Sequence, residues 1–79
     1  MTTHLERIWI DPDRRSGKPC VRGTRITVGE VLGFLAGDGS EAELLRDFPQ
    51  LTHDDILACF EFAAERERRT VVEIVTTAA

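Results

Sequence analysis

The sequence predicts a mainly α domain, made of a short N-terminal β-hairpin, a three-helix bundle with a helix-turn-helix, and a C-terminal strand or arm. Two observations lead to this fold class. Three capping boxes stand in order at the heads of three segments with helical apolar spacing. Ahead of them, two short extended segments flank a polar turn that contains glycine and proline. We therefore expect one domain over residues 1–69 and an arm over residues 70–79.

The N-terminal hairpin is expected from two short runs of strand-forming residues. Residues 7–11, RIWID, alternate between two sides, and the proline that follows stops the strand. Residues 13–19 form a polar turn, and a second extended segment covers residues 19–22. Gly23 then ends this segment, either as a bulge or as a left-handed turn residue.

The three helices are expected from their capping boxes, which are Thr27 to Glu30, Ser40 to Glu43 and Thr52 to Asp55. In each box the hydroxyl accepts from an amide of the first turn, and the carboxylate accepts from the cap amide. The helices should cover about residues 28–36, 41–47 and 53–68. In the third, the spacing assigns a buried stripe to Ile56, Leu57, Phe60, Ala63 and Ala64. The β-branched tail after residue 69 is typical of a strand or an arm.

Length and composition limit the class of protein. A chain of 79 residues is near the lower limit for a self-sufficient core, so we expect a second copy or a partner to add stability. We expect neither a membrane span nor a secretory signal, because the sequence lacks apolar runs of the required length. Two distant cysteines without CxxC spacing agree with a cytoplasmic location.

The charge is distributed unevenly along the chain. The net charge is −4, yet residues 1–29 carry six cations and three acids, whereas the remainder carries four cations and eleven acids. The acidic total argues against strong nonspecific binding to nucleic acid. The basic N-terminal third still allows a local contact with phosphate.

Several motifs together resemble the domain-of-unknown-function family 433. They are Ile10-Asp11-Pro12, Gly17-Lys18-Pro19, Arg22 to Val28 (RGTRITV), Gly39-Ser40, Asp47 to Thr52 (DFPQLT) and Asp55-Ile56. The resemblance covers about residues 8–64. It implies a helix-turn-helix fold of the homeodomain-like type. It also implies a VapB-like antitoxin role, with a PIN-like ribonuclease toxin as the partner encoded beside it.

Contact with operator DNA is expected from the basic hairpin and loop, through Arg14, Arg15, Lys18, Arg22 and Arg25. Two interpretations of Arg22 and Arg25 remain open. They hold a phosphate together with the amides at the start of the first helix, or they pair with acids such as Glu30 or Asp47. The third helix is a poor reader of DNA because Asp54 and Asp55 in its first turn repel phosphates.

Contact with the toxin is expected from the end of the chain, through Arg66, Arg68, Arg69, Val71, Val72, Ile74 and Val75. An arginine inserted among the metal-binding carboxylates of a PIN-like nuclease would displace or mimic the cation, and the apolar tail would add contacts. Two alternatives remain. The arginines are favourable cations at a helix C-terminus, and the tail pairs as a strand within the chain or in a homodimer.

Together these features favour a binding protein. We expect no enzymatic activity, no metal and no cofactor, because neither the histidines nor the cysteines have the spacing of a catalytic or zinc site. The leading hypothesis is an antitoxin that neutralises a PIN-like ribonuclease and binds its own operator. The alternative is a protein-interaction module without DNA binding. A homodimer is expected, with Trp9 or the short N-terminal strands as candidate interface.

Overall fold

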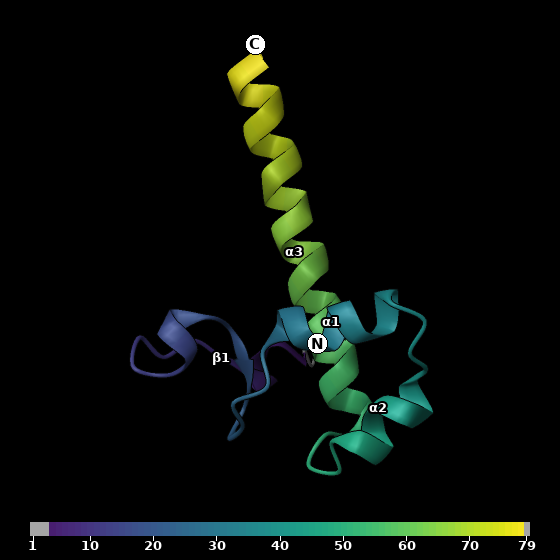
Figure 1. The fold of residues 1–79 in the computed structure, drawn as a ribbon. Coiled ribbons are helices and arrows are strands. Elements are labelled where there is room, and N and C mark those ends of the chain that lie inside the picture. The colour runs from purple at the N-terminus through teal and green to yellow at the C-terminus, as the bar shows by residue number, and fades with distance from the viewer. Residues whose placement is uncertain (1–3, 79) are drawn as a thin grey trace.

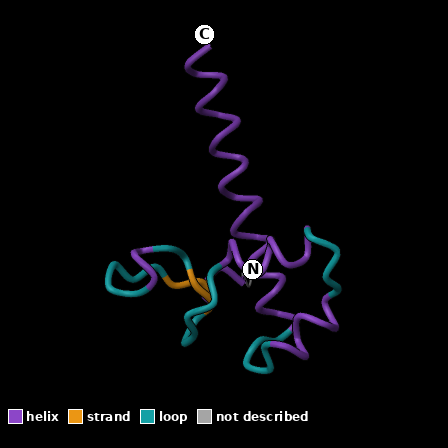
Figure 2. Tube along the Cα trace, in the orientation of Figure 1, coloured by secondary structure: helices purple, strands orange, loops and turns teal. Residues whose placement is uncertain are grey.

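The computed structural model describes residues 4–78, and their side chains as far as residue 69. Its elements are η1 (His4–Arg7), β1 (Ile8–Trp9), η2 (Arg15–Gly17), β2 (Cys20–Val21), α1 (Val28–Ala36), α2 (Glu41–Asp47) and α3 (His53–Ala78), where η denotes a 3-10 helix. A helical body carries a small hairpin on one side, and α3 projects away from it (Figures 1 and 2). The predicted fold class, a hairpin followed by three helices, is confirmed.

The hairpin forms as expected. Its strands are antiparallel, in the register Ile8 to Val21 and Trp9 to Cys20. Gly23 has a φ of +74°, in the left-handed region that glycine adopts without strain, so the chain turns back directly after β2. The returning segment bridges to the other side of β2, from Thr27 to Cys20. The hairpin thereby places residue 27 at the start of α1.

All three predicted capping boxes form. At α1, the Glu30 amide donates to Thr27 Oγ1 at 3.0 Å, and Glu30 Oε1 accepts from the Thr27 amide at 2.9 Å. The same reciprocal pair starts α2. At α3, Asp55 Oδ2 accepts from the Thr52 amide at 2.9 Å, and the Asp55 amide donates to Thr52 Oγ1 at 3.2 Å. These caps explain why each helix begins where the sequence predicts.

The last helix is longer than predicted. We expected it to end near residue 68 and a strand or arm to follow, but the helix continues to Ala78. Residues 53–78 contain no glycine or proline, and β-branched residues cost a helix only a few tenths of a kcal/mol each, so nothing stops propagation. The alternative of a C-terminal strand is therefore wrong. In the described part of the chain, no helix has the length and apolar composition needed to cross a membrane.

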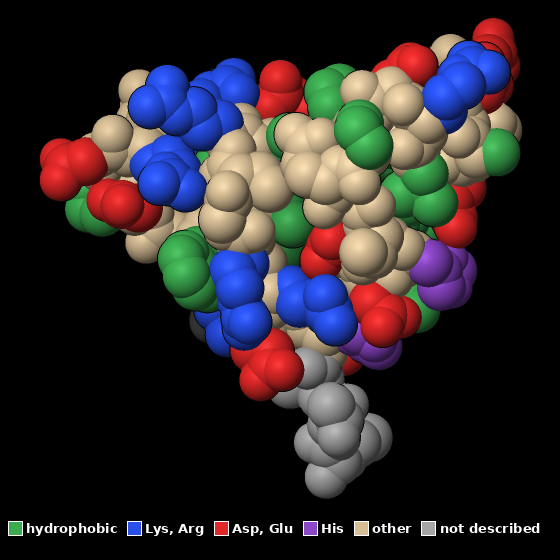
Figure 3. Space-filling model, turned by 90° about the horizontal axis from the view of Figure 1, so that it is seen from below, with side chains coloured by type: hydrophobic (Ala, Val, Ile, Leu, Met, Phe, Trp, Pro, Cys, Tyr) green, Lys and Arg blue, Asp and Glu red, His purple; other side chains and the backbone are tan. Residues whose placement is uncertain are grey.

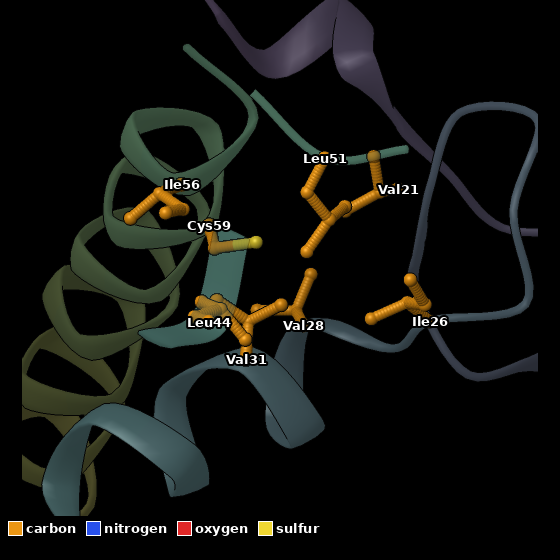
Figure 4. Packing of buried hydrophobic residues seen from close by; sticks show 8 residues of the cluster. All are labelled: Val21, Ile26, Val28, Val31, Leu44, Leu51, Ile56 and Cys59. Carbon is orange, nitrogen blue, oxygen red and sulfur yellow. The ribbon is translucent and has the colours of Figure 1, made fainter. Parts of the chain in front are cut away.

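The core gathers side chains from the hairpin, both short helices, the turn before α3, and α3 itself (Figure 4). Its buried members are Val21, Ile26, Val28, Val31, Leu44, Leu51, Ile56 and Cys59. The expected stripe of α3 is only partly correct, because Phe60 is 48% exposed and Ala64 is also exposed. The N-terminal segment explains the difference. α3 packs against η1 and β1 as well as α1, and together they cover the side of α3 that carries Cys59 and Phe62.

Candidate functional site

The first turn of α3 is in contact with the N-terminal segment. Asp55 is only 7% exposed, and its Oδ1 accepts from Arg7 Nη1 at 3.1 Å. Asp54 lies 3.7 Å from the same guanidinium and 3.8 Å from His4 Nε2. His53 is also engaged, with Nδ1 2.7 Å from Glu41 Oε2 on α2. In a helix-turn-helix protein, the N-terminal residues of the recognition helix contact the bases. In α3 these residues are acidic and pair with side chains of the same chain.

Three of the five predicted DNA-binding cations hold the hairpin loop in place. Arg14 donates to the Thr24 carbonyl at 3.2 Å, and Arg22 donates to the Glu6 carbonyl at 2.8 Å. The Arg22 guanidinium also lies over the Trp9 ring, 5.6 Å from its centroid. The Arg14 contact ties the polar turn to the backbone after β2, and the Arg22 contact ties the residue after β2 to η1.

Arg15 is the residue that pairs with the cap of α1. It donates to Glu30 Oε1 at 2.9 Å and to the Arg25 carbonyl at 2.8 Å. The pKa of the Glu30 carboxyl is lowered, chiefly because it accepts from the Thr27 amide, with further contributions from the Thr27 hydroxyl and the Arg15 charge, against an opposing desolvation effect. One interpretation of the sequence was that Arg22 and Arg25 pair with acids such as Glu30. Glu30 does pair with an arginine of the loop, but that arginine is Arg15.

Lys18 and Arg25 remain available for another molecule. Both are exposed, and within the described residues neither side chain makes a hydrogen bond or an ion pair. Lysine and arginine side chains gather on the side of the molecule that carries the hairpin loop (Figure 3). Of the predicted DNA-binding set, these two cations are the strongest candidates for an external anion.

Two grooves flank α3 where it leaves the body. The β1 groove has a volume of about 500 Å³ and is lined by Leu5, Ile8, Ile10, Phe62, Glu65, Arg66 and Arg69. The α1 groove has a volume of about 520 Å³ and is lined by Arg15, Lys18, Pro19, Thr27, Val28, Gly29, Glu30, Leu32, Phe62, Ala63 and Arg66. Phe62 and Arg66 line both, and the Arg66 guanidinium lies over the Phe62 ring, 5.7 Å from its centroid. Arg66 therefore stands on a ridge between two partly apolar grooves.

The three predicted arginines of α3 do not act as one cluster. Arg66 and Arg69 line the β1 groove, whereas Arg68 lines neither groove. Arg68 donates to Glu65 Oε2 at 2.6 Å, and Arg69 Nε lies 3.6 Å from Glu65 Oε1. The apolar residues predicted to contact a toxin follow residue 69, so their side chains lie outside the described residues. Their backbone continues α3.

The grooves also join residues that the sequence assigned to different partners. The α1 groove brings Arg15 and Lys18 of the hairpin loop together with Arg66 of α3. Sequence reasoning missed this neighbourhood, since the residues lie about 50 positions apart in the chain and no local pattern links them.

The cysteines are structural. Cys20 and Cys59 are both buried and free. Burial, with a smaller contribution from the Asp55 charge, raises the pKa of the Cys59 thiol to about 11, so it stays neutral and unreactive. Among the described residues, no group of three or more His, Cys, Asp or Glu is arranged to hold a metal ion.

Comparisons with known proteins agree with this architecture. A family model described as protein of unknown function (DUF433) matches residues 8–63, a span that ends just before Arg66. The chain is similar to the crystal structure of a DUF433 member protein from Anabaena variabilis, with 28% sequence identity and a TM-score of 0.75. The similarity covers 87% of this chain and 68% of that chain. No curated protein matches this chain.

Proposed function

The chain belongs to the DUF433 family, and we propose that it is the antitoxin of a type II toxin–antitoxin pair, which binds and neutralises a PIN-like ribonuclease. One observation carries the proposal: Arg66 is held over Phe62 on the ridge between two grooves, at the point where α3 leaves the body. The chemistry of this ridge suits an acidic partner with apolar surroundings.

The ridge presents a cation with restricted freedom. Stacking on Phe62 limits the rotamers of Arg66, so less entropy is lost when a carboxylate binds. Nucleases of the PIN-like class use clustered carboxylates to hold a divalent metal, and a guanidinium is a geometric match for two carboxylate oxygens. Arg69 in the β1 groove and Lys18 in the α1 groove add positive charge on either side of the ridge, and Glu65 and Glu30, which line the same grooves, offset part of it.

The projecting part of α3 is also explained by a partner. Residues 70–78 extend the helix beyond the last residue that lines a groove. Helical segments of this length are marginal in water unless they pack on something, because propagation alone contributes little free energy. A ribonuclease that binds the grooves would lie beside this segment and stabilise it.

Inhibition of the ribonuclease encoded beside the chain tests the proposal. We expect Arg66→Ala to weaken inhibition roughly 10- to 100-fold, the value of one or two charge-assisted hydrogen bonds. Arg68→Ala is the matched control, since Arg68 lies on the same helix but outside both grooves, and it should change inhibition little. Equal inhibition by the wild type and an Arg66→Ala, Arg69→Ala double variant would reject the proposal.

Binding of operator DNA is a second candidate, supported by the exposed and unengaged side chains of Lys18 and Arg25. In this arrangement the hairpin loop contacts phosphates, and α3 does not enter the major groove of the DNA, because its first turn is acidic and pairs with Arg7. The alternative function, a protein-interaction module without DNA binding, is supported by the same observation, that the first turn of α3 is acidic and pairs with Arg7.

A gel shift with the DNA upstream of the gene distinguishes the two. If DNA is bound, affinity falls steeply with salt, and a Lys18→Ala, Arg25→Ala double variant loses affinity and reduces the slope of log K against log salt by about two. Arg46→Ala, an exposed arginine on α2, is the control. A wild type that gives no shift at low salt would favour the module without DNA binding.

A further inference from the structure

Trp9 presents an exposed aromatic surface on the hairpin. The residue is 52% exposed, although it pairs across the two strands with Cys20, which is buried. The Arg22 guanidinium lies over its ring, 5.6 Å from the centroid, and Arg22 also donates to the Glu6 carbonyl at 2.8 Å. The two side chains therefore form a stack, and about half of the tryptophan remains accessible to another molecule.

A small hollow beside Trp9 is lined by two of the loop cations, Arg14 and Lys18. Arg14 donates to the Thr24 carbonyl at 3.2 Å, whereas the exposed Lys18 side chain makes no hydrogen bond or ion pair within the described residues. Asp11 is the one acid among the described residues of the lining. With a volume of about 60 Å³ the hollow holds only a few water molecules, so a ligand would lie across it and over the ring.

The hairpin loop that surrounds the ring is positive. Between positions 11 and 25 the chain has five cations and two acids, and Glu30 pairs with one of the cations, Arg15. Lysine and arginine side chains gather on this side of the molecule (Figure 3). An acidic protein segment would match these charges but leave the ring without a partner, whereas an apolar protein surface would cover the ring and bury the cations. A strand of nucleic acid matches both, because it carries flat bases as well as phosphates along its length.

We propose that this face of the hairpin binds single-stranded nucleic acid, with an unpaired base stacked on the exposed part of the Trp9 ring. Arg22 adds a cation beside the stack, and Lys18 contacts a phosphate of the same strand. This ligand differs from the operator candidate, which is a duplex whose phosphates contact Lys18 and Arg25. In a duplex the faces of the bases are stacked on one another, so they do not reach a tryptophan on the surface of a protein.

This site is separate from the proposed toxin contact. Trp9 lines neither of the grooves beside α3, and Arg66 does not line the hollow. Lys18 is shared by both sites, since it lines the hollow and the α1 groove. The two proposals fail separately, because one is read from ribonuclease inhibition and the other from the binding of an oligonucleotide to the chain alone.

The fluorescence of Trp9 tests the proposal, because it is the only tryptophan of the chain and the chain has no tyrosine. At low salt we expect quenching by short oligomers of thymidylate or uridylate, since a base stacks on the ring, and less quenching by a duplex of equal length. Quenching by only one oligomer identifies the strand as DNA or RNA. Poly-glutamate of the same charge should leave the emission unchanged.

Three outcomes of this titration overturn the proposal. In the first, neither oligomer quenches the emission. In the second, poly-glutamate or the duplex quenches it equally, which would show that charge alone acts. In the third, a higher protein concentration changes the emission without any oligomer, which would place a second copy of the chain on the ring.

The anisotropy of a labelled thymidylate oligomer separates stacking from charge. Trp9→Leu keeps an apolar side chain opposite Cys20 but removes the ring, and we expect it to weaken binding roughly 5- to 100-fold, whereas Trp9→Phe retains most of the affinity. The matched control is Ile10→Ala, which alters a neighbouring residue that is 61% exposed and should change the affinity little. Lys18→Ala should lower the slope of log K against log salt by about 0.7. Wild-type affinity in a folded Trp9→Leu variant, or equal losses in Trp9→Leu and Trp9→Phe, would contradict the proposal.

Discussion

Arg7 Nη1 donates to Asp55 Oδ1 at 3.1 Å, joining residues 48 positions apart. This contact fixes the N-terminal η1 helix onto the first turn of α3. Asp55 is the more buried partner, with its side chain 10% exposed against 37% for Arg7. The same carboxylate caps α3 through the Thr52 amide, so one aspartate both starts the helix and anchors the N-terminal segment.

Removing Arg7 should destabilise the fold. Arg7→Met leaves the Asp55 carboxylate buried without its cation, and we expect a loss of about 1–3 kcal/mol, reduced by the partial exposure of Arg7. Urea denaturation followed by circular dichroism measures this. Arg46→Met, which alters an exposed arginine, should change stability by less than about 0.5 kcal/mol. Equal midpoints for the two variants would show that the Arg7 contact contributes nothing.

Stability should fall in acid partly through Glu30. Its pKa is lowered in the folded state, so it contributes stability above the usual carboxyl pKa of about 4.3, and this is lost as the pH falls below that value. Glu30→Gln removes the titration. We therefore expect the melting temperature of this variant to fall less than that of the wild type between about pH 5 and pH 3. Parallel curves for the two proteins would contradict the assignment.

Stability should also fall in alkali through Cys59. The folded pKa is raised to about 11, whereas an unfolded thiol has a pKa of about 8.5, so stability is full below about pH 8.5 and is lost as the pH rises towards 11. Cys59→Ala should lose this slope at the cost of a small cavity. In the native wild type, iodoacetamide should label Cys59 only after unfolding. Rapid labelling at pH 8 without denaturant would contradict the burial.

The tail should add helix without stabilising the body. A chain that ends at residue 69 should retain the thermal midpoint of the body, because residues 70–78 follow the last residues that line the grooves. The full chain should show a larger helical signal at 222 nm once a partner binds the two grooves. A large drop in the midpoint of the shorter chain would mean that the tail belongs to the folded body.

The start points of the helices could be predicted because they depend on local chemistry. A hydroxyl and a carboxylate three residues apart, such as Thr27 and Glu30, form their hydrogen bonds within one turn. The end of α3 could not be predicted in this way. Its tail has strand-forming residues but no breaker, and a helix already started by a folded body propagates through them.

The candidate site depended on contacts that are distant in sequence. The sequence identified Arg66 and the basic loop but assigned them to different partners, whereas both line the α1 groove. One of its two interpretations paired Arg22 and Arg25 with acids such as Glu30 or Asp47. In the structure, Arg15 is the residue that pairs with Glu30. Arg15 has a φ of 51°, so a left-handed turn lies in the loop that carries it. No local pattern in the sequence indicated that η1 packs on α3.

Hydrogen–deuterium exchange of the chain, alone and with the PIN-like ribonuclease that we propose as its partner, tests the central claim most directly. We predict that binding protects α3 from about residue 62 onward, together with residues 15–19 of the loop and the start of α1, because these segments line the two grooves. Protection confined to α2 and the turn before α3, with these segments unchanged, would contradict the claim that Arg66 and its grooves form the partner contact.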